Sequence, residues 1–211
     1  MSLSDDLRLR RRGAEVPSGM NSEFLTRDVL ETLGFARLGD DVLIHSTVVI
    51  VDCSKISLGS RVRIDPFVII STRGGVEFGN NVHIGGHSVL AGHKSVHFDD
   101  FVNISHHVGI YTSNEDISGR TLSNPTVAGF GHARSAPIQF GRHSGVGAGS
   151  MVLPGARFAE GSILGAMSRI GRPMRPWTTY AGIPARRMRE RKRGLLMDEQ
   201  KYLASLKERG T

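Results

Sequence analysis

Large apolar residues recur at every sixth position along most of this chain. Four sets of three begin twenty residues apart: Leu38, Ile44, Ile50; Leu58, Ile64, Ile70; Phe78, Ile84, Leu90; and Phe98, Ile104, Ile110. After a gap, two more sets begin eighteen residues apart: Phe140, Val146, Val152 and Phe158, Leu164, Ile170. Self-similarity at a fixed period indicates a repeat architecture in which each unit packs only on its neighbours.

A second column of small or β-branched residues lies four positions after most of the large ones, as at Val62, Val82, Val102 and Ser144. One large and one small inward residue in every six suits a short strand followed by a sharp corner. Three such sides close one triangular coil, and coils stack at the inter-strand spacing of about 4.8 Å, so that like residues form columns. The pattern predicts a mainly β fold, a parallel β-helix of about six triangular coils.

The repeat also divides the chain. We expect an N-terminal arm and capping helix at 1–37, the β-helix at 38–172 with a long loop insertion at 115–137, and a C-terminal tail and helix at 173–211. Ser22 to Gly34 has the pattern of a capped helix with Leu25, Val29 and Leu33 on one face. This helix would cover the open edge of the first coil. Residues 197–209 predict a second amphipathic helix.

Composition narrows the class of protein. Glycine accounts for 26 residues and aromatics for only 6%, which fits many tight turns around small inward side chains. A single cysteine, Cys53, excludes an internal disulfide and gives no metal cluster, and we expect no metal. The sequence lacks a secretory signal and an apolar run long enough to span a bilayer, so we expect a cytoplasmic protein.

The formal charge of +7 is concentrated near the two ends of the chain. Nucleic acid is one polyanion that such charge attracts. However, the sequence shows no interleaving of aromatic and basic residues of the kind that stacks bases, so we expect no nucleic-acid partner.

Residues 38–189 resemble the hexapeptide-repeat acyltransferases. The specific segments are residues 141–155 (GRHSGVGAGSMVLPG) and 176–186 (PWTTYAGIPAR), while residues 110–126 (IYTSNEDISGRTLSNPT) look like the branch that modifies surface polysaccharides. The resemblance implies a left-handed β-helix, a homotrimer, and acetyl-CoA lying in the groove between neighbouring subunits. A lipid-linked glycan acceptor would place such an enzyme at the membrane surface.

By motif, the resemblance also implies a set of cofactor-binding residues. Ala148 and Ala166 take corner positions whose backbone contacts the pantetheine arm in relatives, and Gly171 and Arg172 stand where relatives place a Thr-Lys pair on the cofactor. Arg186 and Arg189 would face the phosphates, because a guanidinium binds phosphate oxygens in pairs. Trp177 stacks on adenine or packs on the last coil; the sequence leaves both open.

The catalytic base is not evident from the sequence. Relatives place a catalytic His near the position taken here by Glu115 or Asp116, so that role cannot be carried over. The candidates for a catalytic role are Asp116, His106, His107 and His132, and the candidates for binding sugar hydroxyls are His87, Asn114 and Asn124. Each has an ordinary structural role as its alternative, such as turn capping for Asp116. An amine acceptor can attack without a strong base, so the missing His favours an amino sugar.

The sequence therefore predicts a CoA-dependent acyltransferase that moves an acetyl or other acyl group to a hydroxyl or amino group of a sugar, in surface-polysaccharide biosynthesis. An N-acetyltransferase of a nucleotide-linked amino sugar is one alternative, and a non-catalytic scaffold is another. A γ-type carbonic anhydrase shares the fold, but it needs two metal-binding histidines five positions apart, and no two of the nine histidines here have that spacing.

Overall fold

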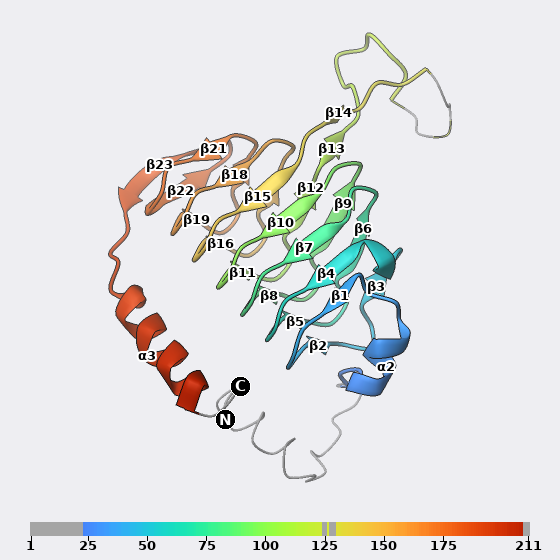
Figure 1. The fold of residues 1–211 in the computed structure, drawn as a ribbon. Coiled ribbons are helices and arrows are strands. Elements are labelled where there is room, and N and C mark those ends of the chain that lie inside the picture. The colour runs from blue at the N-terminus through green and yellow to red at the C-terminus, as the bar shows by residue number, and fades with distance from the viewer. Residues whose placement is uncertain (1–22, 124–125, 127–129, 209–211) are drawn as a thin grey trace.

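The computed structural model describes residues 23–123, 126 and 130–208. Short strands separated by tight corners wind into a three-sided prism, whose coils follow the chain from one end to the other (Figure 1). Each side of the prism is one parallel sheet, and each full coil contributes one strand to each sheet.

The first sheet has seven strands. They are β1 (Arg37–Leu38), β4 (Ile56–Leu58), β7 (Val76–Phe78), β10 (Val96–Phe98), β15 (Ile138–Phe140), β18 (Arg157–Phe158) and β21 (Pro173–Met174).

The second sheet has eight strands, of which the last is antiparallel to its neighbour. They are β2 (Leu43–Ile44), β5 (Arg63–Ile64), β8 (His83–Ile84), β11 (Asn103–Ile104), β16 (Gly145–Val146), β19 (Ile163–Leu164), β22 (Thr178–Gly182) and β23 (Ala185–Glu190).

The third sheet has six strands: β3 (Val49–Ile50), β6 (Ile69–Thr72), β9 (Val89–Gly92), β12 (Gly109–Tyr111), β17 (Met151–Val152) and β20 (Arg169–Ile170). A short 3-10 helix, Cys53–Lys55, precedes β4. The first corner joins the first sheet to the second, the second corner joins the second sheet to the third, and the third corner joins the third sheet to the next coil.

The core is the set of apolar columns that the period of six predicts. Phe78, Phe98, Phe140 and Phe158 are buried one above another, with ring centroids 4.6 to 4.9 Å apart. The pairing register keeps like residues opposite each other, as for Ile84 and Ile104. Because each coil repeats the inward pattern of the last, one continuous core forms although each coil packs only on its neighbours.

The prism has one more turn than the six that the sequence predicts. Residues 173–182 add a seventh, partial coil, in which Met174 pairs with Phe158 and Tyr180 pairs with Leu164. Both pairs are sixteen residues apart rather than eighteen, so the shorter turn breaks the period that revealed the other coils.

The long insertion leaves the prism at the third corner of the fourth coil. β13 (Ser113–Asn114) and β14 (Arg134–Ser135) form a two-stranded antiparallel stem, and the loop beyond it projects away from the prism (Figure 1). β10 nevertheless pairs in register with β15 across the insertion, so the prism continues as if the loop were absent.

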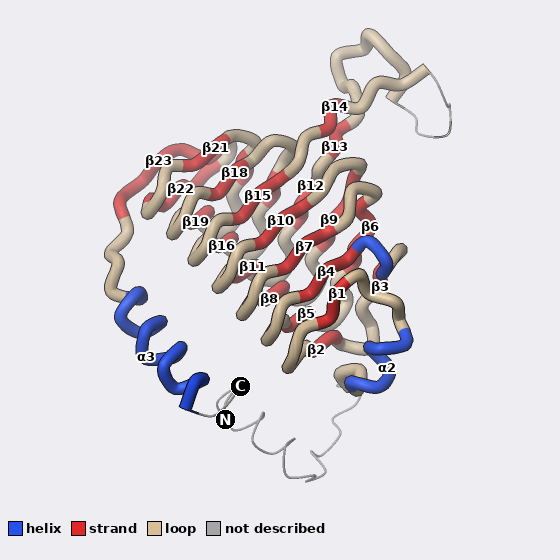
Figure 2. The backbone as a smooth tube through the Cα atoms, in the orientation of Figure 1, coloured by secondary structure: helices blue, strands red, loops and turns tan. Residues whose placement is uncertain are grey.

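Helices stand at the ends of the described chain (Figure 2). α2 (Arg27–Thr32) covers the first coil and buries Leu30 against the core. Of the predicted apolar face, Leu25 packs against the core from just before the helix, whereas Val29 and Leu33 are exposed. The helix begins at Arg27 and has only six residues, and Leu30 is its one buried side chain. α3 (Leu195–Glu208) folds back along the outside of the prism, and no described helix is long and apolar enough to span a membrane.

Candidate active site

The second corner carries three histidines that the sequence marks as site candidates: His106 and His107 for catalysis, and His87 for binding the sugar. Phe67, His87 and His107 take the same place in three successive coils, with left-handed backbone φ angles of 61°, 59° and 57°. The ring centroids lie 4.8 Å apart for Phe67 and His87, and 4.9 Å apart for His87 and His107. His106 is exposed beside them. The structure therefore brings His87, His106 and His107 together on one edge.

In the next two coils the same edge carries Ala148 and Ala166, with the exposed Met167 beside Ala166 and packed over Gly149. Ala148 and Ala166 are exposed there, and the N–H of Met167 donates to the carbonyl of Ala148 at 2.8 Å. A Cβ on Gly147 would lie 2.3 Å from the nitrogen of Ala166, so the two corners are in backbone contact. Within the described chain, the N–H groups of Ala148 and Ala166 donate to no acceptor. Free amides on an exposed edge suit an extended amide-bearing ligand such as a pantetheine arm.

The basic residues between positions 186 and 193 fall into two groups by their contacts. Arg191 donates to the carbonyl oxygens of Gly161 and His143 and thereby fixes the segment before α3. Arg186 and Arg189 lie exposed on β23, and no described acidic side chain forms an ion pair with either of them. No described carboxylate occupies the donors of this exposed pair, and their role at the cofactor phosphates stays a prediction.

Two other predicted cofactor residues lie on a different edge of the same chain. Gly171 and Arg172 follow β20 at the third corner, and both are exposed. Nη2 of Arg172 donates to the carbonyl of Ala185 at 3.1 Å. Arg172 therefore lies on a different edge of the prism from Ala148 and Ala166.

Trp177 takes the first corner of the last coil, where it is 6% exposed. The guanidinium of Arg193 lies 5.4 Å from its ring centroid, and the backbone N–H of Arg191 donates to its carbonyl. Gly161 packs against the same ring, since a Cβ there would lie 2.5 Å from it. We therefore assign Trp177 to packing beneath the segment that leads to α3 rather than to adenine.

The predicted loop residues are separated from the histidine edge within one chain. Asn114 lies on the stem opposite Arg134, His132 is exposed in the loop, and Asn124 falls outside the described residues. Oδ1 of Asp116 accepts from the N–H of Ser118 at 2.8 Å and Oδ2 accepts from Thr121 Oγ1 at 3.0 Å. These hydrogen bonds lower the pKa of Asp116 and leave it a weak base, which supports a turn-capping role.

A polar row on the outer face of the second sheet was not among the sequence candidates. Arg63, His83 and Asn103 are neighbours in register on β5, β8 and β11. Oδ1 of the buried Asp65 lies 2.6 Å from Arg63 Nε, and Oδ2 lies 2.8 Å from His83 Nε2. Burial alone would raise the pKa of Asp65, but the hydrogen bonds from His83 and Arg63 outweigh it and hold that pKa at about 2.

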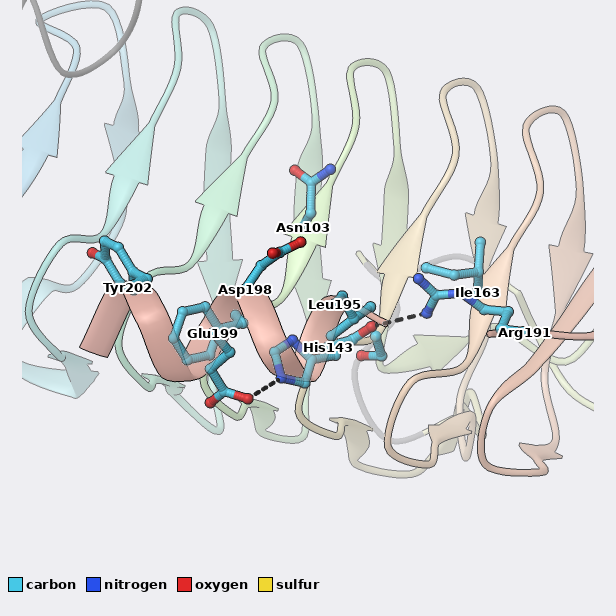
Figure 3. A pocket seen from close by; sticks show the side chains of 10 residues that line it. Asn103, His143, Ile163, Arg191, Leu195, Asp198, Glu199 and Tyr202 are labelled. Carbon is cyan, nitrogen blue, oxygen red and sulfur yellow. Dashed lines mark hydrogen bonds and ion pairs between the residues drawn. The ribbon is translucent and has the colours of Figure 1, made fainter. Parts of the chain in front are cut away.

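A cavity of about 430 Å³ lies between the prism and α3 (Figure 3). Its prism wall includes Asn103 and His143, and its helix wall includes Asp198, Glu199 and Tyr202. Nε2 of His143 lies 2.9 Å from Glu199, and Tyr202 donates to Asn81 at 2.7 Å, so polar contacts hold the helix over the cavity.

Comparison with known proteins decides the family. No family model matches the chain. A dTDP-4-amino-4,6-dideoxy-D-glucose acyltransferase from Escherichia coli is 35% identical over 184 residues, which cover 86% of this chain and 96% of that protein. The chain belongs to the hexapeptide-repeat sugar acyltransferases.

Solved structures agree with this assignment. AntD, an N-acyltransferase from Bacillus cereus in complex with dTDP and 3-hydroxybutyryl-CoA, is 31% identical, with a TM-score of 0.85 over 88% of this chain and 99% of that one. A variant of AntD in complex with dTDP-4-amino-4,6-dideoxyglucose and coenzyme A has a TM-score of 0.84 at 31% identity, over 87% and 99% of the two chains. These matches confirm the predicted left-handed β-helix and the predicted sugar acyltransferase.

The polar row of this acyltransferase did leave a signal in the sequence. Arg63, His83 and Asn103 follow one another at twenty-residue intervals, the period of the early coils, so their stacking could have been inferred. The role of Asp65 could not have been inferred in this way. Asp65 lies at the start of a corner, and its role depends on a side-chain conformation that brings its carboxylate to Arg63 and His83. The catalytic and sugar-binding candidates from the sequence lie at corners and in the projecting loop with its stem, whereas this row lies on a face of the prism.

Proposed function

We propose that this acyltransferase moves an acyl group from acyl-CoA to the amino group of a nucleotide-linked amino sugar. The observation that supports this most directly is the second corner, where the free amides of Ala148 and Ala166 lead to the exposed ring of His107. The acyl-CoA arm lies along the part of this edge that carries Ala148 and Ala166, with its thioester beside the histidines. The relatives' acceptor, an amino sugar carried on dTDP, agrees with the absence of the usual catalytic His.

The chemistry needs little from the protein beyond placement. The uncharged amine attacks the thioester carbonyl, so a C–N bond forms and the carbonyl oxygen becomes an oxyanion that backbone N–H groups stabilise. The tetrahedral intermediate then collapses, the C–S bond breaks, and the nitrogen loses a proton to the departing thiolate. His106 or His107 relays this proton, which requires an imidazole within hydrogen-bond reach of the nitrogen.

We further propose that the working form is a homotrimer in the cytoplasm. The outer face of the third sheet carries a column of exposed apolar residues, including Val49, Ile69 and Met151, which are 53%, 40% and 43% exposed. A contiguous apolar face on a sheet is typical of an interface. Neighbouring copies would cover this face and bring the projecting loop, with Asp116 and His132, to the histidine edge.

This assignment keeps the predicted role in surface-polysaccharide assembly, because an N-acylated nucleotide sugar is an activated donor for a glycosyltransferase. A nucleotide-linked acceptor needs no membrane, so a lipid-linked glycan is not part of the proposal.

The test is turnover with matched acceptors. The purified protein is incubated with acetyl-CoA or 3-hydroxybutyryl-CoA and either dTDP-4-amino-4,6-dideoxyglucose or dTDP-glucose, and release of the free thiol is followed with product mass. We expect acylation of the amino sugar only, with a rate that falls as pH drops through the pKa of the acceptor amine. Acylation of hydroxyl groups alone would overturn the proposed acceptor.

A further inference from the structure

The outer face of the second sheet presents a short polar row between apolar neighbours. Arg63, His83 and Asn103 point outward in consecutive coils, while Leu43 precedes them and Ile163 lies beyond Gly145 in the same column. Such faces in a solenoid are usually varied, so three stacked hydrogen-bonding groups in register form a distinct surface feature.

The row is held in one arrangement by Asp65, whose side chain is 8% exposed. One carboxylate oxygen of Asp65 accepts a hydrogen bond from Nε of Arg63, and the other accepts one from Nε2 of His83. Nδ1 of His83 faces Oδ1 of Asn103 at 2.8 Å. Both ring nitrogens of His83 therefore face oxygen acceptors, an arrangement that only the doubly protonated ring satisfies. Burial opposes that charge, but the hydrogen bonds to Asp65 and Asn103 raise the pKa of His83.

This arrangement leaves the outward groups as donors. Asn103 uses its carbonyl oxygen toward His83, so its amide N–H groups face outward. Arg63 uses Nε on Asp65, and within the described chain its terminal nitrogens have no hydrogen-bonded acceptor. The guanidinium lies 5.2 Å from the Phe24 ring centroid, which fixes its plane. Arg63 and the protonated ring of His83 share one carboxylate, so the row is positively charged whenever His83 is protonated.

The row lies between the histidines of the second corner and the cavity beneath α3. The strands that carry it run directly into the second corner, where His87 and His107 stand. Asn103 lines the cavity beneath α3, whose helix side carries the carboxylates of Asp198 and Glu199 (Figure 3). Glu199 already pairs with Arg142 and His143, so the available carboxylate is that of Asp198, which is 81% exposed. A carboxylate repels phosphate but accepts hydrogen bonds from hydroxyl groups, so the cavity suits the nucleoside and the row suits the diphosphate.

We propose that Arg63, His83 and Asn103 bind the diphosphate of the nucleotide-linked acceptor, with Arg63 and Asn103 donating hydrogen bonds to its oxygens and His83 supplying charge and orienting Asn103. The site places the sugar toward the histidine edge and the nucleoside toward α3. This inference rests on the proposed function, since it names where that acceptor is held.

A second histidine cluster provides the control. His97, on the first sheet, has Nδ1 at 3.1 Å from Glu77 and Nε2 at 2.8 Å from Asp99. Two carboxylates around one imidazole leave this cluster negative, so it does not attract phosphate. His97→Gln therefore matches His83→Gln in chemistry, and Arg157→Gln, on the exposed face of the first sheet, matches Arg63→Gln.

The experiment measures binding of dTDP, thymidine and coenzyme A by calorimetry to the wild type and to these variants, with Asn103→Ala added. We expect His83→Gln, Arg63→Gln and Asn103→Ala each to weaken dTDP binding at least tenfold. Coenzyme A affinity and thymidine affinity should stay within twofold, which also shows that the variants fold. Arg63→Lys should fall between wild type and Arg63→Gln, because it keeps the charge and loses the paired donors.

Wild-type dTDP affinity in His83→Gln and Arg63→Gln would overturn the site. An equal loss of thymidine affinity would also overturn it, because the diphosphate would then not be the group recognised. Turnover separates this inference from the proposed function. If the wild type binds dTDP through the row but acylates no amino sugar, the proposed acceptor fails and the site stands. If amino-sugar turnover keeps its acceptor KM in the variants, the function stands and the site fails.

Discussion

Nε2 of His143 lies 2.9 Å from Oε2 of Glu199, although 56 residues separate the two along the chain. The contact joins the first corner of the fifth coil to α3, and the same carboxylate also pairs with Arg142. α3 has no fully buried residue, and it is held against the prism by polar contacts of this kind together with the ring contact between Phe101 and Tyr202.

Glu199→Gln should therefore loosen α3 without unfolding the prism. Loss of a charged partner for Arg142 and His143 removes roughly 2 kcal/mol of local stability, because hydrogen bonds to charged groups are worth about that much. Hydrogen exchange should show faster exchange in residues 195–208 and unchanged protection in the strands. Asp198→Asn is the matched control, since its side chain is 81% exposed and pairs only with Lys201. Equal protection of α3 in Glu199→Gln and wild type would contradict this prediction.

Asp65 gives stability a defined dependence on pH. The folded pKa of about 2 lies below the unfolded value of 3.8, so its contribution is complete above pH 3.8 and is lost as pH falls through about 2. The shift corresponds to about 2 kcal/mol. His83 acts oppositely: its pKa is raised, so its contribution is complete below pH 6.5 and is lost as pH rises through the folded value.

Asp65→Asn should accordingly destabilise the protein most between pH 4 and pH 6.5. Urea unfolding at pH 2.5, 5.5 and 9 measures this, and the gap between wild type and variant should be widest at pH 5.5. Proton titration by NMR should show the pKa of His83 falling in the variant. A gap that does not change with pH would mean that Asp65 stabilises through packing alone.

A single isosteric substitution of Asp116 distinguishes a turn-capping role from a role as catalytic base. Asp116→Asn keeps an acceptor for the Ser118 N–H, so the loop turn should persist. We expect turnover within threefold of wild type, while Asp116→Ala, which removes both acceptors, should lower turnover at least tenfold. A loss of a hundredfold or more in Asp116→Asn would restore the base role.

Arg186 is expected to act on the cofactor rather than on the chemical step. Arg186→Ala should raise the KM for acyl-CoA about tenfold and leave kcat within twofold, because it removes a phosphate contact that is equal in ground and transition states. Arg187→Ala is the matched control, since Arg187 pairs with Glu190 at 2.9 Å. An unchanged KM in Arg186→Ala would remove this residue from the cofactor site.

The apolar third face predicts an oligomer that charge can split. Ile69→Glu combined with Met151→Glu places carboxylates in the proposed interface, so light scattering should show a mass near that of the monomer. Gln139→Glu, on the exposed face of the first sheet, should leave the trimer intact. A wild-type protein that is monomeric at micromolar concentration would contradict the interface itself.

The columns of the prism could be predicted from the sequence because each depends only on residue type and spacing. Phe78, Phe98 and Phe140 stack as the period requires, and the projecting loop lies where the period stops. The last coil was not predicted because Tyr180 follows Leu164 by sixteen residues rather than eighteen.

The site was harder to predict, for physical reasons. The burial of Trp177 depends on the path of the segment after β23, and the capping role of Asp116 depends on a loop whose turns no repeat constrains. The partners of His83 depend on side-chain rotamers. Such contacts arise from three-dimensional paths that a one-dimensional period does not encode.

Because β10 pairs with β15 across the insertion, the prism and the projecting loop can change independently of each other in evolution. Each rung is templated by the rung beneath it, so the projecting segment contributes nothing to the register of the later rungs. Evolution can therefore lengthen, shorten or replace the loop while the second corner, where we propose that the thioester lies, stays unchanged. An engineer seeking a new acceptor could exchange that segment at its two-stranded stem and leave the rest of the chain alone.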